Sequence, residues 1–324
     1  MEDFFSMDDL YDEYDTVILG GGPAGLTAAI YASRDMMKTL VLEKNFPGGQ
    51  VALTEQVDNY PGFPEGIMGG DLSMKMYEHA KAFNVQVKNA IPKEFNFDGK
   101  YKYIHLENED ITIKTKTIII ATGAKPKHLE VEGENRFLGR GISFCATCDG
   151  AFFKDKDVAV IGGGDSAVEE GVYLTKFAKK VYIVHRRDKL RAAKILQERA
   201  FQNDKVEFIY NCVVDKVNGE NKLESLTLYD RVKNEKKDLK VDGVFVFIGW
   251  TADTEIFKGM IEMDEAGFIK ANEKMETNVP GVYVAGDVRQ KELRQIVTSV
   301  SDGAIAAKSA EKFITANFLI GGKP

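Results

Sequence analysis

The chain of 324 residues is 44% hydrophobic, and its 43 basic and 50 acidic side chains leave a formal net charge of −7. The length predicts about two domains, the hydrophobic content is sufficient for packed cores, and the acidic balance argues against nonspecific nucleic-acid binding. No apolar run reaches the about 20 residues of a membrane-spanning helix. The chain also lacks the basic segment and apolar core of a secretory signal, so we expect a cytoplasmic protein without membrane association.

An acidic segment, residues 1–14, precedes the first predicted element and is interpreted as an N-terminal extension. A short apolar run at 15–19 then leads into a glycine-rich turn at 20–25, followed by a helical stretch at 26–32 and a second apolar run at 39–42. A G-x-G-x-x-G turn between a strand and a helix is the dinucleotide-binding fingerprint of Rossmann-type domains.

The glycines Gly20, Gly22 and Gly25 of this turn allow the backbone to approach a pyrophosphate at the helix N-terminus. Glu43 ends the second strand, at about the interval where a carboxylate accepts hydrogen bonds from ribose hydroxyls. This first unit is therefore predicted to bind FAD or NAD. Residues 95–113 then alternate apolar and polar side chains and predict a β-hairpin.

A Cys-x-x-Cys pair, Cys145 and Cys148, follows a buried-type strand at 117–123. Such a pair can be half of a zinc site, a redox centre or a chance occurrence. Zinc needs four ligands, and neither Cys212 nor the scattered histidines have metal spacing, so no metal is expected. Low cysteine usage argues against an inert disulfide. A cycling redox dithiol is the preferred interpretation, and Cys212 is interpreted as a core residue.

A second fingerprint begins at Gly162, after an apolar run at 158–161, and a helix at 168–177 and a strand at 181–184 are predicted to follow. Where the first unit has Glu43, this one has a basic cluster: His185, Arg186, Arg187 and, a little later, Arg191. A carboxylate would repel a 2′-phosphate, whereas guanidinium groups bind one bidentately. The second unit is therefore predicted to bind NADP, with a solvated basic face as the alternative.

The C-terminal third contains a strand at 244–248, a turn–strand–Gly-Asp segment at 278–287 and a small-residue helix at 296–312. An acid such as Asp287 at the end of a strand points into the ligand crevice of an α/β fold. If this tail completes the first sheet, the second domain is an insertion joined by connectors at 124–127 and 251–254.

With these motifs in place, the chain resembles the low-molecular-weight, bacterial-type thioredoxin reductases, which are flavoproteins with two dinucleotide-binding domains. The matching segments are 20–25, 48–50, 59–62, 121–123, 145–150, 162–170, 185–191, 285–288 and 294–295. The resemblance implies an α/β fold with two Rossmann-like domains. An NADPH-binding domain at 125–252, carrying the cysteine pair, is inserted into a discontinuous FAD-binding domain at 15–124 and 253–324. It also implies a homodimer and rotation of the inserted domain about its connectors.

The resemblance assigns roles to individual residues. FAD is held by Gly20, Gly22, Gly25, Glu43, Gly49, Gln50, Asn59, Asp287, Arg294 and Gln295, and NADPH by Gly162, Gly164, Ser166, Ala167, His185, Arg186, Arg187 and Arg191. Cys148 faces the flavin, Cys145 attacks the acceptor disulfide, and Asp149 transfers protons, although an acid here is also common as a helix cap or turn residue.

Two nucleotide sites and a dithiol predict electron transfer from NADPH through FAD and the Cys145/Cys148 pair to thioredoxin. Two alternatives remain open. The same relay could serve a peroxiredoxin-like or glutaredoxin-like acceptor, or the protein could be a flavin-bound redox sensor with little turnover.

Overall fold

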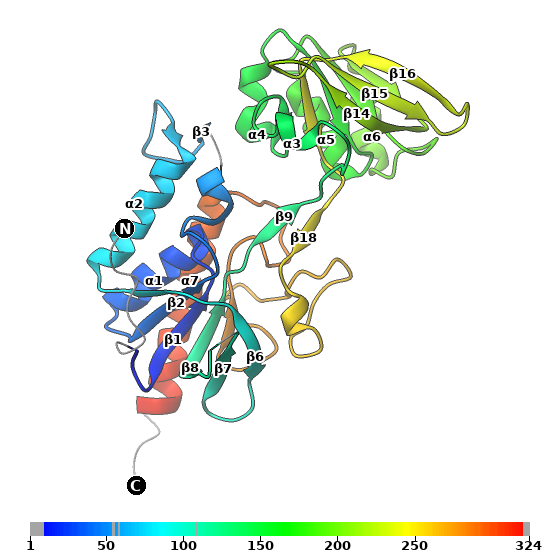
Figure 1. Cartoon of the computed structure of the whole chain (residues 1–324). Coiled ribbons are helices and arrows are strands. Elements are labelled where there is room, and N and C mark those ends of the chain that lie inside the picture. Colours follow the sequence, from blue (N-terminus) through cyan, green and yellow to red (C-terminus); the bar gives the residue numbers. More distant parts are fainter. Residues whose placement is uncertain (1–9, 54–55, 58, 108, 320–324) are drawn as a thin grey trace. The chain divides into compact units, whose positions relative to one another are not determined.

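The computed structural model describes residues 10–53, 56–57, 59–107 and 109–319 (Figure 1). The chain divides into two compact units: unit 1 comprises residues 1–125 and 251–324, and unit 2 comprises residues 126–250. Where the chain passes between them, β9 (Ala124–Pro126) pairs with β18 (Trp250–Ala252). Most of the acidic extension lies outside the described residues.

Unit 1 is built on a mostly parallel sheet with the strand order β5-β2-β1-β8-β7-β6, and β19 pairs with the central β8. In this sheet β7 runs antiparallel to both of its neighbours, β6 and β8, and β6 and β7 form the predicted hairpin. The strands are β1 (Tyr14–Leu19), β2 (Thr39–Glu43), β5 (Gln86–Asn89), β6 (Pro92–Asn96), β7 (Lys102–Leu106), β8 (Thr112–Ile120) and β19 (Val282–Val284). The helices are α1 (Pro23–Arg34), α2 (Gly69–Ala82) and α7 (Ile296–Ile314). Smaller elements are β3 (Gln56–Val57), β4 (Ile67–Met68), the 3₁₀ turns Gly49–Leu53 and Glu255–Phe257, and the π-helical turn Thr315–Leu319.

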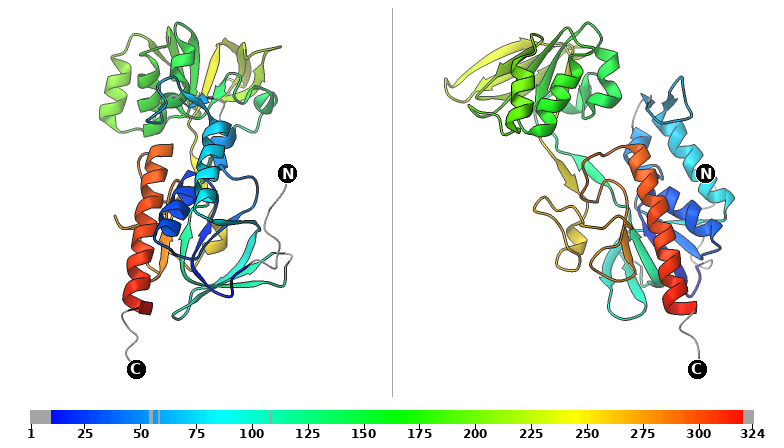
Figure 2. Two further views of the ribbon diagram at one scale, coloured as in Figure 1. Left: turned by 90° about the vertical axis from the view of Figure 1, so that its left-hand side faces the viewer. Right: turned by 180° about the vertical axis from the view of Figure 1, so that it is seen from behind.

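The chain's own small residues determine how closely α1 and α7 pack, and the two helices lie side by side in Figure 2. A Cβ added to Gly303 of α7 would lie 2.2 Å from the carbonyl oxygen of Ala24, so a larger residue would separate the two helices. Helix α1 begins at Pro23, earlier than predicted, because proline is well suited to the first helical position. The C-terminal tail completes the sheet, since Val282 pairs with Ile118 in parallel register.

Unit 2 contains a five-stranded parallel sheet in the order β10-β17-β11-β12-β13 and a three-stranded antiparallel sheet, β14-β15-β16. The strands are β10 (Ile142–Ser143), β11 (Asp157–Ile161), β12 (Lys180–Val184), β13 (Val206–Ile209), β14 (Cys212–Asn218), β15 (Ser225–Asp230), β16 (Glu235–Lys240) and β17 (Gly243–Val246). The helices are α3 (Glu134–Phe137), α4 (Ala146–Asp149), α5 (Asp165–Leu174) and α6 (Lys194–Phe201), with a 3₁₀ turn at Gly150–Phe153.

The predicted α/β class is confirmed, and two local expectations are refined. Helix α5 begins at Asp165 rather than at 168, because an acidic residue in the first turn is favourable near the positive end of the helix dipole. Cys212 is buried at the start of β14 and carries a free thiol, as expected of a core residue. None of the described helices is long and apolar enough to cross a membrane.

Candidate active site

The first glycine turn, between β1 and α1, contains glycines of two kinds. Gly20 has φ +107°, and a Cβ there would lie 2.4 Å from the carbonyl oxygen of Ala121. A Cβ on Gly25 would lie 1.8 Å from the carbonyl oxygen of Gly20. The fold itself therefore requires glycine at both positions.

Gly22, in contrast, has an ordinary φ of −78°. Among the described residues, a Cβ on Gly22 would come within 4 Å only of Gly49 Cα, at 3.9 Å. The protein could therefore accommodate a side chain here, and the space above Gly22 at the N-terminus of α1 is open. An open glycine turn at this place fits the pyrophosphate of a dinucleotide, which backbone N–H groups and the helix dipole would hold.

Glu43, at the end of β2, is held against the same turn. The Gly21 backbone N–H donates to Glu43 Oε2 at 2.6 Å, and the Asn45 N–H donates to Oε1 at 2.8 Å. The carboxylate is buried, yet each of its oxygens has a second lone pair. Glu43 can therefore stabilise the glycine turn and still accept a hydrogen bond from a ribose hydroxyl.

The structure brings together several of the predicted flavin-lining residues that are distant in sequence. Asn59 Nδ2 donates to Gln295 Oε1 at 2.9 Å. Arg294 Nε lies 3.4 Å from the carbonyl oxygen of Asp287. Gly49 faces Gly22 across the open turn, whereas the neighbouring Gln50 is exposed in its 3₁₀ turn.

Sequence reasoning missed a buried charge cluster around Asp287. Lys291 Nζ lies 3.0 Å from Asp302 Oδ2 and 3.6 Å from Asp287 Oδ1, and Arg289 Nη2 lies 3.2 Å from Asp302 Oδ1. Burial raises the pKa of Asp287, and the Lys291 cation partly opposes that shift. The i,i+4 spacing of Asp287 and Lys291 was a possible signal, but only the packing of α7 brings Asp302 into the cluster.

The second glycine turn, between β11 and α5, has the same two kinds of glycine. A Cβ on Gly162 would lie 2.5 Å from the carbonyl oxygen of Phe247 and 2.6 Å from the Cβ of Ala167. Gly164 has φ −91°, and among the described residues a Cβ there would come within 4 Å only of Arg191 Nη2, at 4.0 Å. This turn is therefore also open at its second glycine, and a guanidinium group lies beside it.

The remaining residues of the basic cluster differ in exposure. Arg186 and Arg187 are exposed, as is Ser166 in the first turn of α5. His185 is buried behind the turn, where a Cβ on Gly163 would lie 2.2 Å from its Nδ1. Burial lowers the pKa of His185, and the nearby Arg191 cation lowers it further. The imidazole thus packs behind the middle glycine, and its contact with a nucleotide stays a prediction.

The two predicted redox cysteines form a disulfide at the end of β10. The Cys148 backbone N–H donates to Cys145 Sγ at 3.2 Å, and Thr147 Oγ1 lies 3.4 Å from the same sulfur. Two potential donors therefore surround Cys145 Sγ, and they would stabilise a thiolate there once the disulfide is reduced. Asp149 lies at the end of α4, where Ser143 Oγ is 2.5 Å from its Oδ2. Sequence reasoning did not identify Ser143.

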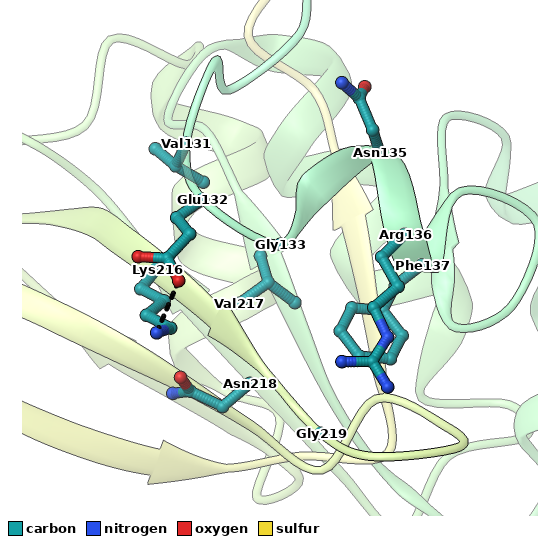
Figure 3. A pocket seen from close by; sticks show the side chains of 10 residues that line it. All are labelled: Val131, Glu132, Gly133, Asn135, Arg136, Phe137, Lys216, Val217, Asn218 and Gly219. Atoms are coloured by element: carbon teal, nitrogen blue, oxygen red, sulfur yellow. Dashed lines mark ion pairs between the residues drawn. The ribbon is translucent and has the colours of Figure 1, made fainter.

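A separate open pocket of about 630 Å³ lies elsewhere in unit 2, between residues 131–137 and residues 216–219 of β14 and its following turn (Figure 3). Lys216 Nζ and Glu132 Oε1 form an ion pair of 2.7 Å on one side of it. None of the predicted site residues is among the described residues that line the pocket. The candidate site therefore consists of the glycine turns and the disulfide and does not include this pocket.

Comparison with known proteins shows the family to which the chain belongs. The model of the pyridine nucleotide-disulphide oxidoreductase family matches residues 14–303. Thioredoxin reductase from Bacillus subtilis (strain 168) is 52% identical over 303 residues, which cover 93% of this chain and 95% of the relative. The solved thioredoxin reductase from Streptococcus pyogenes is 45% identical, with a TM-score of 0.88 over 94% of this chain and 99% of that one. The chain belongs to the pyridine nucleotide-disulphide oxidoreductase family and, within it, to the thioredoxin reductases.

Proposed function

We propose that the protein is an NADPH-dependent flavoprotein that reduces the disulfide of thioredoxin. The observation that carries this proposal is the Cys145–Cys148 disulfide, in a chain that also has two open glycine turns. FAD, when bound, carries two electrons from NADPH to this disulfide. The names of the similar proteins, at about half identity over nearly the whole chain, support thioredoxin as the acceptor.

Unit 1 would hold FAD. The open space at Gly22 would receive the pyrophosphate, and Glu43 would accept a ribose hydroxyl hydrogen bond. The Asn59–Gln295 pair and Asp287 would line the remainder of the cofactor. The contact of Lys291 with both Asp287 and Asp302 supports this assignment, because it keeps the Asp287 carboxylate in one orientation at the end of β19.

Unit 2 would hold NADPH. The open space at Gly164 would receive the pyrophosphate at the N-terminus of α5. Arg186, Arg187 and Arg191 would bind the 2′-phosphate, since guanidinium groups pair bidentately with phosphate oxygens. The location of Arg191 beside Gly164 supports the assignment.

The reduced cysteine pair would pass electrons to the acceptor by two thiol–disulfide exchanges. The Cys145 thiol loses its proton, and its Sγ attacks one sulfur of the acceptor disulfide to form a mixed disulfide. The other acceptor sulfur leaves as a thiolate and takes up the proton that Cys145 lost. Cys148 Sγ then attacks Cys145 Sγ, which restores the Cys145–Cys148 bond and releases the second acceptor thiolate. Asp149 takes the proton of the Cys148 thiol and gives it to this departing sulfur. The net result is the transfer of two electrons and two protons.

The family resemblance further supports a homodimer that acts in the cytoplasm. The expected result in solution is a mass of about twice the 36.0 kDa chain. This assembly is separate from the chemistry described above, because both glycine turns and the disulfide belong to a single chain.

The test of the function is turnover with defined acceptors. The FAD-loaded protein should oxidise NADPH rapidly in the presence of an oxidised thioredoxin, and the thioredoxin should gain two thiols per NADPH consumed. Parallel assays with a glutaredoxin and a peroxiredoxin distinguish the alternative acceptors. If NADPH reduces the flavin but no acceptor is turned over, the protein is a flavin-bound redox sensor and the proposal is wrong.

The choice of nucleotide should depend on the arginine cluster. The unaltered protein should prefer NADPH to NADH. Each guanidinium removed in Arg186→Ala and Arg187→Ala should cost about 1.5–3 kcal/mol of binding, or about ten- to a hundred-fold in kcat/KM for NADPH. The value of kcat/KM for NADH should change little, because NADH has no 2′-phosphate. Arg199→Ala, an exposed arginine at the end of α6, is a matched control. Equal use of both nucleotides by the unaltered protein would contradict the assignment.

A further inference from the structure

Ser143 is a buried residue that contacts both Cys145 and Asp149. It is the last residue of β10 and is only 5% exposed. The strand is the two-residue edge of the five-stranded sheet, where Ser143 pairs with Phe245 of β17 in parallel register. The side chain is buried, and its hydroxyl is held by hydrogen bonds within the redox turn.

The hydroxyl contacts three groups of the redox turn. Ser143 Oγ lies 2.5 Å from Asp149 Oδ2 and 3.2 Å from the carbonyl oxygen of Cys145, and it accepts the Cys145 backbone N–H at 3.1 Å. Ser143 thus joins the backbone of the attacking cysteine to the carboxyl group of the proton-transferring acid.

The hydroxyl of Ser143 can form a hydrogen bond with Asp149 in either protonation state of the carboxyl group. Serine has one proton to donate and two lone pairs with which to accept. When Asp149 is a carboxylate, Ser143 donates to it, and 2.5 Å is typical of an O–H···O⁻ hydrogen bond. When Asp149 is a carboxylic acid, its proton can be donated to Ser143 Oγ, and the serine proton can turn to the Cys145 carbonyl oxygen. The Cys145 N–H bond is kept in both cases.

From this arrangement we infer that Ser143 is a positioning residue that holds the Asp149 carboxyl group in both of its protonation states during exchange with the acceptor. The inference rests on the proposed function. An acid that gains and loses a proton in every cycle needs a partner that both accepts and donates, and an alanine or a backbone amide cannot do both. Ser143 keeps its own proton in both states, because only the direction of its hydrogen bond with Asp149 changes.

The test compares Ser143→Ala, Asp149→Asn and the double variant, each loaded with FAD and reduced with one equivalent of NADPH. Stopped-flow mixing with oxidised thioredoxin then gives the rate of acceptor reduction across the neutral pH range. We expect Asp149→Asn to slow this step about a hundred-fold and Ser143→Ala about tenfold, with flavin reduction by NADPH unchanged in both. Ser225→Ala, in strand β15 of the same unit, is the control and should behave as the unaltered protein.

Two measurements distinguish a role of Ser143 in positioning Asp149 from a role in stabilising the fold alone. The charge-assisted bond from Ser143 to the Asp149 carboxylate is stronger than the neutral bond it makes with the protonated acid. Its loss in Ser143→Ala should therefore move the Asp149-dependent limb of the pH profile to higher pH. In the Asp149→Asn background, Ser143→Ala should add less than about a twofold effect, as expected of residues that act as a unit. An unmoved limb, or the same tenfold loss in both backgrounds, would overturn the inference.

Failure of this inference can be distinguished from failure of the proposed function. If the unaltered protein does not reduce thioredoxin, the function is wrong, and Ser143 is then judged with a small aromatic disulfide as the oxidant of the reduced pair. The same displacement of the pH limb between Ser143→Ala and the unaltered protein is expected there, and an identical pH profile for the two proteins would refute the role of Ser143.

Discussion

Cys145→Ser and Cys148→Ser should each lose at least about a thousand-fold in turnover with thioredoxin, because the two sulfurs act as a unit and neither alone completes the exchange. Reduction of the flavin by NADPH should persist in both, since that step needs neither cysteine. NADPH oxidation coupled to thioredoxin measures the loss, and bleaching of the flavin absorbance measures the step that is retained.

The two variants should nevertheless differ from each other. The family resemblance implies that Cys148 faces the flavin. Cys145→Ser should therefore show a long-wavelength absorbance band from a Cys148 thiolate beside oxidised flavin, and Cys148→Ser should lack it. Cys148→Ser retains the attacking thiol, so it should accumulate a stable mixed disulfide with thioredoxin, detectable by mass spectrometry. The contacts of Cys145 Sγ with the Cys148 N–H and Thr147 Oγ1 favour its role as the attacking thiolate.

Cys212→Ala provides the matched control, because Cys212 is buried in the core of unit 2 and is not part of the disulfide. It should lower the free energy of unfolding and leave turnover nearly intact. Were Cys145→Ser or Cys148→Ser to behave in the same way, the pair would be structural, and the electron relay would be refuted.

Gly22→Val should yield protein that is folded but free of FAD, with at least about a hundred-fold loss of FAD affinity. The reason lies in the contrast among the three glycines of the first turn. The fold requires Gly20 and Gly25, whereas Gly22 has an ordinary φ and only one distant neighbour among the described residues. A valine there should therefore clash with bound FAD rather than with the protein. Flavin absorbance after purification and titration of the apo-protein with FAD measure the effect.

Gly70→Val is a suitable control, because a Cβ at Gly70 also has its nearest neighbour at 3.9 Å and this residue lies in the same unit, in the first turn of α2. It should retain FAD. Comparison of thermal unfolding in the absence of cofactor shows whether Gly22→Val is folded. A yellow Gly22→Val protein with normal FAD content would show that the first turn does not hold the pyrophosphate.

Local sequence patterns were sufficient to predict the two glycine turns and the redox pair. The chemistry of each is contained in a few consecutive residues: a strand, a turn that needs glycine and the N-terminus of a helix in one case, and two cysteines at one helical turn's spacing in the other. Short-range sterics and the helix dipole do not depend on the remainder of the chain. For the same reason, the α/β class was predictable from alternating strand and helix patterns.

The tertiary structure alone decided which distant groups meet. The Asn59–Gln295 hydrogen bond and the ion pair of Lys291 with Asp302 join segments that only the folding of α7 brings together. The antiparallel sheet β14-β15-β16 was also not predicted. Ser143 is close to Asp149 in sequence, yet its role depends on the burial of β10, which directs the hydroxyl at the carboxyl group. Such contacts depend on packing and side-chain direction, which a linear pattern does not contain.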